Sequence, residues 1–124
     1  MDRTSLEAWL RAYGRAWENR DAGAFAALFA PDARYYWTPF EEPKLGQAGV
    51  AQAFENAVAR QTDIRFEATV LKVEGAQGIA HWKCTFQRLG NDSTVRLDGV
   101  FVMQFDEHGL CTIFREWWHR DETM

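Results

Sequence analysis

A glutamate near the C-terminal end of the chain, Glu116, stands between two large aromatic residues at alternate positions, Phe114 and Trp118. Alternate side chains of an extended strand project from the same face, so this carboxyl group is expected among aromatic rings. Burial of that kind disfavours the charged carboxylate and raises its pKa toward neutrality. A carboxyl group with such a pKa suits general acid or base catalysis near pH 7. Glu116 is therefore the first candidate catalytic residue.

Two other interpretations of Glu116 stay open at this stage. The carboxylate can accept a hydrogen bond from a buried tyrosine or tryptophan and serve only to fix the core, because structural networks also perturb acids. Alternatively, a β-bulge can turn the side chain toward solvent. The surrounding elements decide among these interpretations.

Helical periodicity dominates the first half of the chain and strand patterns dominate the second. The sequence predicts helices over residues 6–20, 24–29 and 46–59, the first of them capped by Ser5 or Thr4. An aromatic stripe recurs every four residues along the first helix, at Trp9, Tyr13 and Trp17. A short β-rich run follows at residues 35–37, and long strands are predicted over 64–74, 79–88, 94–105 and 110–120. Helices followed by a meander of antiparallel strands indicate an α+β fold.

The two hairpins give an expected register. If the last turn closes at Phe105 and Leu110, Gly99 lies opposite Glu116 and leaves space beside the carboxyl group. The predicted inner face is nearly all apolar and carries Trp82, Cys84, Phe86, Leu97, Gly99, Phe101, Met103, Phe114, Glu116 and Trp118. The predicted outer face is largely polar and carries His81, Lys83, Thr85, Arg96, Asp98, Arg115, Trp117 and His119.

Composition limits the possible classes of protein. The 124 residues suffice for one domain, 1–124, and the content of 47% apolar and 15% aromatic residues excludes disorder. A net charge of −4 and a pI near 5.3 argue against a nucleic-acid partner. No apolar run is long enough to span a membrane, and no secretion signal is evident. Only two cysteines are present, which favours a reducing, cytoplasmic location.

Neither the histidines nor the cysteines form a convincing reactive set. His81, His108 and His119 have no spacing that gives a tetrahedral or facial ligand set, so no metal is expected. Cys84 is predicted to point inward and Cys111 outward, so that they do not pair. No histidine shares the predicted face of Cys84, so a thiolate nucleophile is not expected either.

The chain resembles the nuclear transport factor 2-like superfamily, and within it the SnoaL-like and ketosteroid isomerase-like branch. The segments that carry the resemblance are residues 10–13, residues 21–33 (DAGAFAALFAPDA), residues 46–54 and residues 104–109. The resemblance implies a cone-shaped α+β barrel of the cystatin-like type, in which a curved antiparallel sheet wraps around three N-terminal helices. It also implies a cavity for a small apolar or cyclic molecule, and a homodimer built through the outer face of the sheet.

The isomerase site transfers to this chain only in part. Its oxyanion-donating tyrosine falls on Tyr13. Its general-base aspartate falls on Trp37, or on Thr38 if Pro39 is the anchor, and its protonated aspartate falls on Phe101. None of these last three residues has a carboxyl group, so ketosteroid isomerisation itself is not expected.

The resulting hypothesis is a cofactor-independent isomerase, cyclase, dehydratase or hydrolase that acts on a hydrophobic cyclic substrate. Glu116 is the expected acid or base and Tyr13 the donor that polarises a substrate oxygen. The residues expected to line the pocket are Trp9, Trp17, Trp37, Trp82, Cys84, Gly99, Phe101, Phe114 and Trp118. Two alternatives are a cone filled by its own aromatic side chains and a non-catalytic domain for ligand binding, dimerisation or protein interaction.

Overall fold

Three helices and one six-stranded sheet make up the protein in a computed structural model that describes residues 1–124. The helices are α1 (Arg3–Glu18), α2 (Ala22–Ala26) and α3 (Gly46–Val58). The strands are β1 (Phe29–Tyr36), β2 (Lys44–Leu45), β3 (Gln61–Glu74), β4 (Gln77–Arg88), β5 (Thr94–Phe105) and β6 (Cys111–Thr123). The predicted α+β fold is confirmed.

Helix α1 begins earlier than its sequence pattern indicates. The Asp2 carboxylate accepts a hydrogen bond from the Ser5 backbone N–H at 2.8 Å, so Asp2 is the N-cap and the expected Ser5 or Thr4 cap is wrong. The predicted apolar face of the helix is confirmed, since Trp9, Leu10 and Tyr13 are all buried against the sheet. This helix carries the first candidate donor into the interior.

The chain between α2 and β1 differs from the expected helix over 24–29. Asp21 caps α2 through a 3.0 Å bond from the Ala24 N–H, and the helix ends at Ala26. The Leu28 carbonyl then accepts from the Trp9 indole N–H at 3.1 Å and from the Cys111 N–H at 3.0 Å. These tertiary bonds replace a further helical turn, so Phe29 starts a strand that passes through Pro31.

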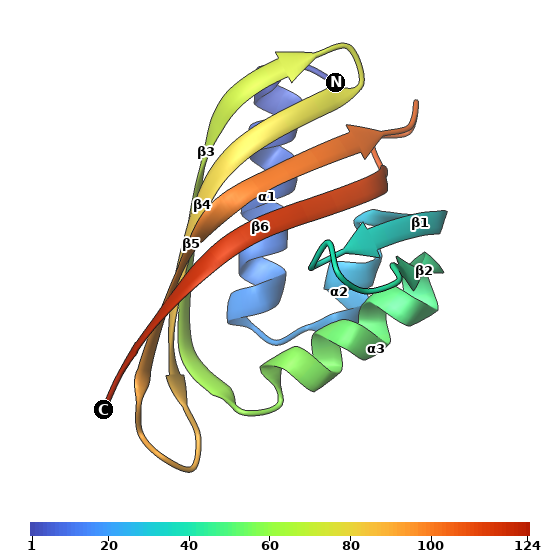
Figure 1. The fold of residues 1–124 in the computed structure, drawn as a ribbon. Coiled ribbons are helices and arrows are strands. Elements are labelled where there is room, and N and C mark those ends of the chain that lie inside the picture. The colour runs from blue at the N-terminus through green and yellow to red at the C-terminus, as the bar shows by residue number, and fades with distance from the viewer.

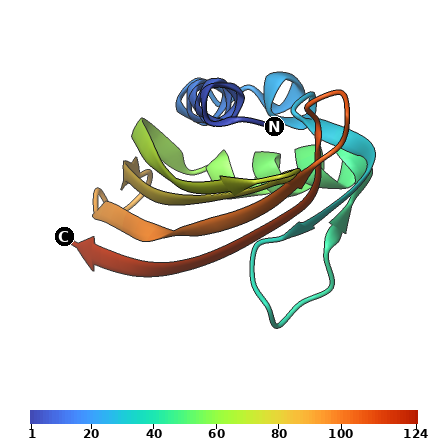
Figure 2. The same ribbon diagram turned by 90° about the horizontal axis from the view of Figure 1, so that it is seen from above.

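The sheet is mixed, so a purely antiparallel meander is an incomplete description. Its strand order is β2-β1-β6-β5-β4-β3, and β1 pairs with β6 in parallel while the other neighbours are antiparallel. The short strand β2 has no counterpart among the expected elements. All three helices lie on the same, concave side of the curved sheet (Figures 1 and 2), while the far ends of β5 and β6 extend beyond them toward the C-terminus. No helix is long and apolar enough to cross a membrane.

The expected register of the last hairpin is wrong, although its faces are right. Glu116 pairs with Phe101, and Gly99 pairs with Trp118. The turn closes through a bond from the Asp106 N–H to the Leu110 carbonyl, and an irregularity beside Phe105 adds a further residue to β6. Together these move the pairing by two residues, and an even shift leaves the side chains from Ile113 onward on their predicted faces.

The same irregularity reverses the expectation for Cys111. This residue lies at the start of β6, before the extra residue, and its pairing with Phe105 places it among buried side chains. Cys111 is therefore completely buried and does not point outward. Both cysteines are free thiols.

Gly99 has a packing role rather than leaving space beside the carboxyl group. A Cβ added at this position would collide with the Trp117 carbonyl oxygen and come within 2.9 Å of the Trp118 Cα. The absence of a side chain thus lets β5 and β6 approach closely at the level where Trp118 leaves the core.

We expect Gly99→Ala to lower the free energy of unfolding by about 2 kcal/mol, because the backbone of β6 must move to accept the methyl group. Gly23→Ala is the matched control, since a Cβ there meets only the Asp21 carboxylate at 3.6 Å, an ordinary contact. Urea denaturation of both variants measures the difference. Equal stability of the two variants would contradict the close approach at Gly99.

Candidate functional site

A cavity of about 360 Å³ opens on the concave side of the sheet, between the C-terminal half of α1, helix α3 and the inner faces of β4, β5 and β6. Its wall is mostly apolar and is lined by Tyr13, Trp17, Phe25, Tyr35, Trp37, Lys44, Val50, Ala53, Phe54, Asn56, Ala57, Val58, Gln61, Trp82, Phe86, Arg88, Leu97, Glu116, Trp118 and Arg120. Its volume lies within the range of pockets that hold small molecules. The aromatic side chains therefore do not fill the cone completely.

Glu116 lies in the wall of this cavity with only 8% of its surface exposed. Burial raises the pKa of its carboxyl group to about 8, and the hydrogen bond from Tyr35 opposes that rise. No cation forms an ion pair with Glu116. The group is consequently protonated for the most part at neutral pH and able to change its charge close to it.

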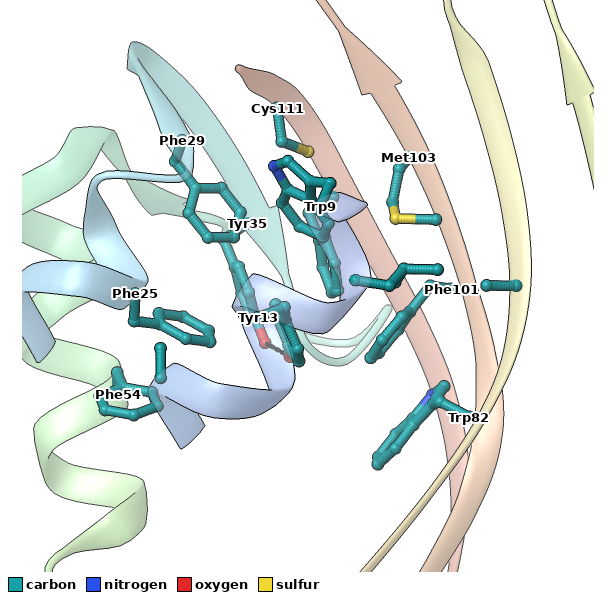
Figure 3. Close-up of a cluster of buried hydrophobic side chains, with 14 of the residues drawn as sticks. Trp9, Tyr13, Phe25, Phe29, Tyr35, Phe54, Trp82, Phe101, Met103 and Cys111 are labelled. Carbon is teal, nitrogen blue, oxygen red and sulfur yellow. Dashed lines mark hydrogen bonds between the residues drawn. The ribbon is translucent and has the colours of Figure 1, made fainter. Parts of the chain in front are cut away.

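Two tyrosines connect to Glu116 in a chain of hydroxyl groups. The Tyr35 hydroxyl donates to Glu116 Oε2 at 3.3 Å, and it lies 3.4 Å from the Tyr13 hydroxyl. Figure 3 shows Tyr13 and Tyr35 reaching toward each other from α1 and β1. Burial and the nearby carboxyl group raise the pKa of both phenols well above their usual value. Both hydroxyls therefore keep their protons and serve as hydrogen-bond donors.

The ring of Phe114 spaces the two tyrosines. It stacks on Tyr35 at 4.8 Å with an angle of 7° between the planes, and on Tyr13 at 5.6 Å with an angle of 11°. Parallel stacking against one fixed ring restricts both phenols, so their hydroxyls meet beside Glu116. Phe114 is fully buried and is not part of the cavity wall.

Tyr35 is the residue of the site that the sequence reasoning missed. The sequence predicts an extended run at 35–37 and places Trp37 in the pocket wall. Because side chains alternate along a strand, Tyr35 lies on the same face as Trp37, and a pocket position for Trp37 therefore implies one for Tyr35. The partnership with Glu116 could not be predicted, because it depends on the parallel pairing of Tyr35 with Phe114.

The residues expected to line the pocket divide into two groups. Trp17, Trp37, Trp82 and Trp118 do line the cavity, together with the candidate donor Tyr13. Trp9, Cys84, Phe101 and Phe114 lie in the core behind its wall, and Gly99 is a partly buried position of β5 that does not line the cavity either. Trp9 is held there by edge contacts with Phe29 and Phe105, at 5.7 and 5.3 Å between ring centroids.

Two tryptophans stand at the outer end of the cavity. Trp37 and Trp118 are each 37% exposed, and the Trp118 indole N–H donates to the Trp37 carbonyl oxygen at 3.2 Å. Helix α3 supplies the opposite wall through Val50, Phe54 and Val58. The sequence predicted the apolar face of this helix but gave no indication that it forms one wall of the cavity.

The histidines and thiols show no arrangement for metal or nucleophile chemistry. No three His, Cys, Asp or Glu side chains lie close enough together to hold a metal ion. His81 pairs with Asp98 at 2.7 Å on the outer face of the sheet. Burial raises the pKa of both the Cys84 and Cys111 thiols, so neither forms a thiolate readily.

Comparison with known proteins places this geometry in a family. A model of the SnoaL-like domain matches residues 10–113. No curated protein sequence matches the chain.

Solved structures share the fold at low sequence identity. Rv0760c from Mycobacterium tuberculosis superposes with a TM-score of 0.81 at 16% identity, covering 99% of each chain. The epoxide hydrolase/cyclase-like enzyme SalBIII, of pyran ring formation in the polyether salinomycin, gives 0.81 at 16% identity, over 95% of this chain and 93% of SalBIII. A type 2 hexachlorocyclohexane dehydrochlorinase, LinA, gives 0.81 at 12% identity, over 98% and 88% of the two chains.

The buried carboxyl group predicts a characteristic pH dependence of stability. Glu116 loses its proton near pH 4.5 in the unfolded chain and near pH 8 in the folded protein. Between these values the folded state binds more protons, so this group makes the free energy of unfolding fall as the pH rises. Each unit of pKa difference corresponds to about 1.4 kcal/mol. The contribution is fully present below the lower value and is lost above the higher one.

Urea denaturation across that window tests this expectation with Glu116→Gln as the reference. The wild type is expected to lose stability relative to the variant as the pH rises from 4.5 to about 8, because glutamine does not titrate. Parallel stability curves for the two proteins would show that Glu116 titrates normally and is not buried as described.

Proposed function

The chain belongs to the SnoaL-like domain family, and we propose that this protein is a small-molecule enzyme that uses acid–base chemistry without a cofactor. Its substrate is a hydrophobic cyclic compound that fits the aromatic cavity. The observation that carries the proposal is the isolated carboxyl group of Glu116, which lies in an apolar wall and has a pKa of about 8. A buried acid poised near neutrality is suited to moving protons.

The proposed reaction begins with proton donation from Glu116 to a substrate oxygen, such as a carbonyl oxygen. The carboxylate that results then removes a proton from the carbon next to the activated group. The proton is returned to the enzyme in this second step, so the net change is a rearrangement of the substrate and Glu116 is regenerated. Tyr13 polarises the substrate oxygen, and Tyr35 orients Glu116 through its 3.3 Å hydrogen bond.

The neighbouring structures support this class of substrate by analogy. Their names refer to pyran ring formation and to a chlorinated cyclohexane, which are both chemistry on ring compounds. The aromatic wall of the present cavity suits such substrates, since flat rings pack well against tryptophan and phenylalanine. The analogy extends to the class of substrate and not to a particular molecule.

Deuterium exchange followed by NMR tests the proposal. Cyclic ketones, lactones and polyketide fragments are incubated with the enzyme in D2O, and exchange at the carbon next to the carbonyl group is measured. We expect Glu116→Gln to slow the exchange by about 10²-fold or more. Tyr35→Phe should slow it less, because the phenol positions the acid rather than supplying the proton.

Glu107→Gln is the matched control, because Glu107 is an exposed glutamate in the turn between β5 and β6. Activity equal to the wild type is expected for it. Ring compounds that bind without exchange, and bind equally well to Glu116→Gln, would instead favour a non-catalytic ligand-binding domain. That second function is favoured by the extent of the aromatic wall, which suffices for binding alone.

We also propose that two copies associate through the outer face of the sheet, in a reducing cytoplasmic setting that suits two free thiols. The support is a group of apolar side chains that lies among polar residues such as His81 and Arg115 on the outward side of β4, β5 and β6. Trp117 is 47% exposed there and pairs with Val100, while Val102 and Ile79 occupy the adjacent row. Exposed apolar patches of this kind mark association surfaces.

Sedimentation analysis of Trp117→Glu tests the dimer. The wild type is expected to sediment as a dimer, and the variant as a monomer, because a carboxylate at the centre of the interface leaves a charge without a partner. Gln52→Glu, at an exposed position of α3 on the opposite side of the sheet, makes the same change in charge and is expected to leave the dimer intact. A monomeric wild type would contradict the proposed interface.

A further inference from the structure

Apart from the two tyrosines, two polar side chains are buried in the wall of the cavity. Glu116 comes from β6 and Gln61 from the start of β3, and each is 8% exposed. The third buried polar residue, Ser93, lies outside the cavity, and its hydroxyl already has partners in Asn91 and Glu122. The proposed reaction uses Glu116 and gives Gln61 no task.

The Trp17 indole fixes the orientation of the Gln61 amide group. The indole N–H donates to Gln61 Oε1 at 2.8 Å, and because an indole N–H acts only as a donor, the amide atom that faces it is the oxygen. The amide nitrogen is the other arm of the group and has no hydrogen-bond partner in the protein. It is not enclosed, since Trp82 Nε1 is the one fully buried side-chain nitrogen or oxygen without a partner. Gln61 therefore presents N–H donors to the open space of the cavity.

Two other nitrogen-bearing side chains of the wall differ from Gln61. Asn56 is exposed, and its Oδ1 accepts from the Gln52 amide at 3.2 Å on the surface of α3. Arg88 pairs with Glu122 at 3.0 Å. The Gln61 amide is both withdrawn from bulk water and without a partner for its nitrogen. Such a group costs free energy unless a bound molecule supplies the acceptor.

Helix α1 connects the amide to the acid. Tyr13 and Trp17 are one turn apart on this helix, a rise of about 6 Å, and their rings meet edge to face at 6.2 Å between centroids. Trp17 holds Gln61, while the Tyr13 hydroxyl lies 3.4 Å from the Tyr35 hydroxyl, which donates to Glu116. The wall between the two polar groups is therefore aromatic, with a hydrogen-bonding group at each end.

We propose that the ligand of this cavity is a ring compound with an oxygen at each end, and that Gln61 donates to the oxygen that does not react. The other oxygen lies beside Glu116 and Tyr13, and the ring packs against the aromatic wall between them. The inference deepens the proposed function, because it assumes the same substrate site and adds a second polar group to the substrate. Amide N–H groups bind carbonyl, hydroxyl and ether oxygens, which are uncharged and enter an apolar cavity at a lower cost than an ion does.

Selectivity and orientation follow from this arrangement. A ligand that lacks the second oxygen would cover the Gln61 N–H groups with apolar surface and remove them from water without an acceptor. Sites built around a buried polar group reject such analogues for this reason. Trp17 supports the selection as a positioning residue, because its bond to Oε1 keeps the amide oxygen from facing the ligand.

Calorimetric titration with matched pairs of probes tests the inference. The probes are cyclohexane-1,4-dione and trans-decalin-2,6-dione, whose two oxygens are separated by different lengths of ring. Each is compared with the analogue in which a methylidene group of the same shape replaces one carbonyl oxygen. We expect at least one dione to bind the wild type about tenfold more tightly than its analogue.

Gln61→Met and Trp17→Phe identify the group responsible for this preference. Methionine has a similar length and no N–H donor, so the preference for the dione should disappear. A merely structural role of Gln61 would weaken both members of a pair equally and leave their ratio unchanged. Trp17→Phe keeps an aromatic ring but lets the amide turn over, so the preference should fall by about threefold.

Gln104→Met is the matched control, since it makes the same substitution at an exposed position of β5 outside the cavity. This variant should keep the preference of the wild type. Equal binding of each dione and its analogue to the wild type, an unchanged preference in Gln61→Met, or no binding of either dione would each overturn the inference.

The two proposals fail in distinguishable ways. Deuterium exchange by the wild type that is lost in Glu116→Gln reports on the acid–base chemistry whether or not a second oxygen is preferred. Intact exchange without a preference for diones would overturn only the inferred second oxygen of the ligand. A preference for diones that depends on Gln61, without exchange, would instead retain the inferred ligand and overturn the proposed catalysis.

Discussion

The parallel pairing of β1 with β6 joins two segments from opposite ends of the chain, and the geometry of the site depends on it. Tyr35 pairs with Phe114, two residues before Glu116 on β6, and its hydroxyl group donates a hydrogen bond to the Glu116 carboxyl group. Because β2 pairs with β1 and α3 follows β2 directly, the pairing of β1 with β6 also positions α3, which forms the far wall of the cavity. Without it, Glu116 would face an open groove and remain hydrated, and its pKa would be that of an ordinary surface acid.

A neutral acid in an apolar wall requires rigid surroundings, because a mobile wall would admit water and restore the charge. The stacked rings of Tyr13, Phe114 and Tyr35 supply this rigidity, and each contact also buries apolar surface. Phe114 therefore contributes to the site without touching the cavity. The same aromatic rings therefore stabilise the fold by packing and keep water away from Glu116, which raises the pKa of its carboxyl group.

Patterns that repeat along the sequence predicted the parts of the structure that depend on local order. The four-residue stripe of Trp9, Tyr13 and Trp17 identified α1, and alternation around Glu116 identified the inner face of β6. Predictions failed where distant segments decide. The Leu28 carbonyl accepts bonds from Trp9 and Cys111, which no local pattern encodes, so the sequence predicts the end of a helix where the structure has the start of a strand. The role of Tyr35 was missed for the same reason. The register error came from the turn at Asp106, whose closure depends on side-chain and backbone bonds that composition alone does not specify.

Strand β6 passes from the interior of the protein to its surface, so its residues differ in how much they contribute to folding. Glu116 lies where a change of side chain disturbs the core, whereas Trp118 is partly exposed and Arg120 is exposed, so replacements at these two positions have smaller effects on folding. Over evolutionary time the outer positions are free to vary while the inner one is constrained. Related proteins can therefore acquire new ligand preferences through a few surface substitutions on one strand, with the proton-transferring group and the architecture around it unchanged.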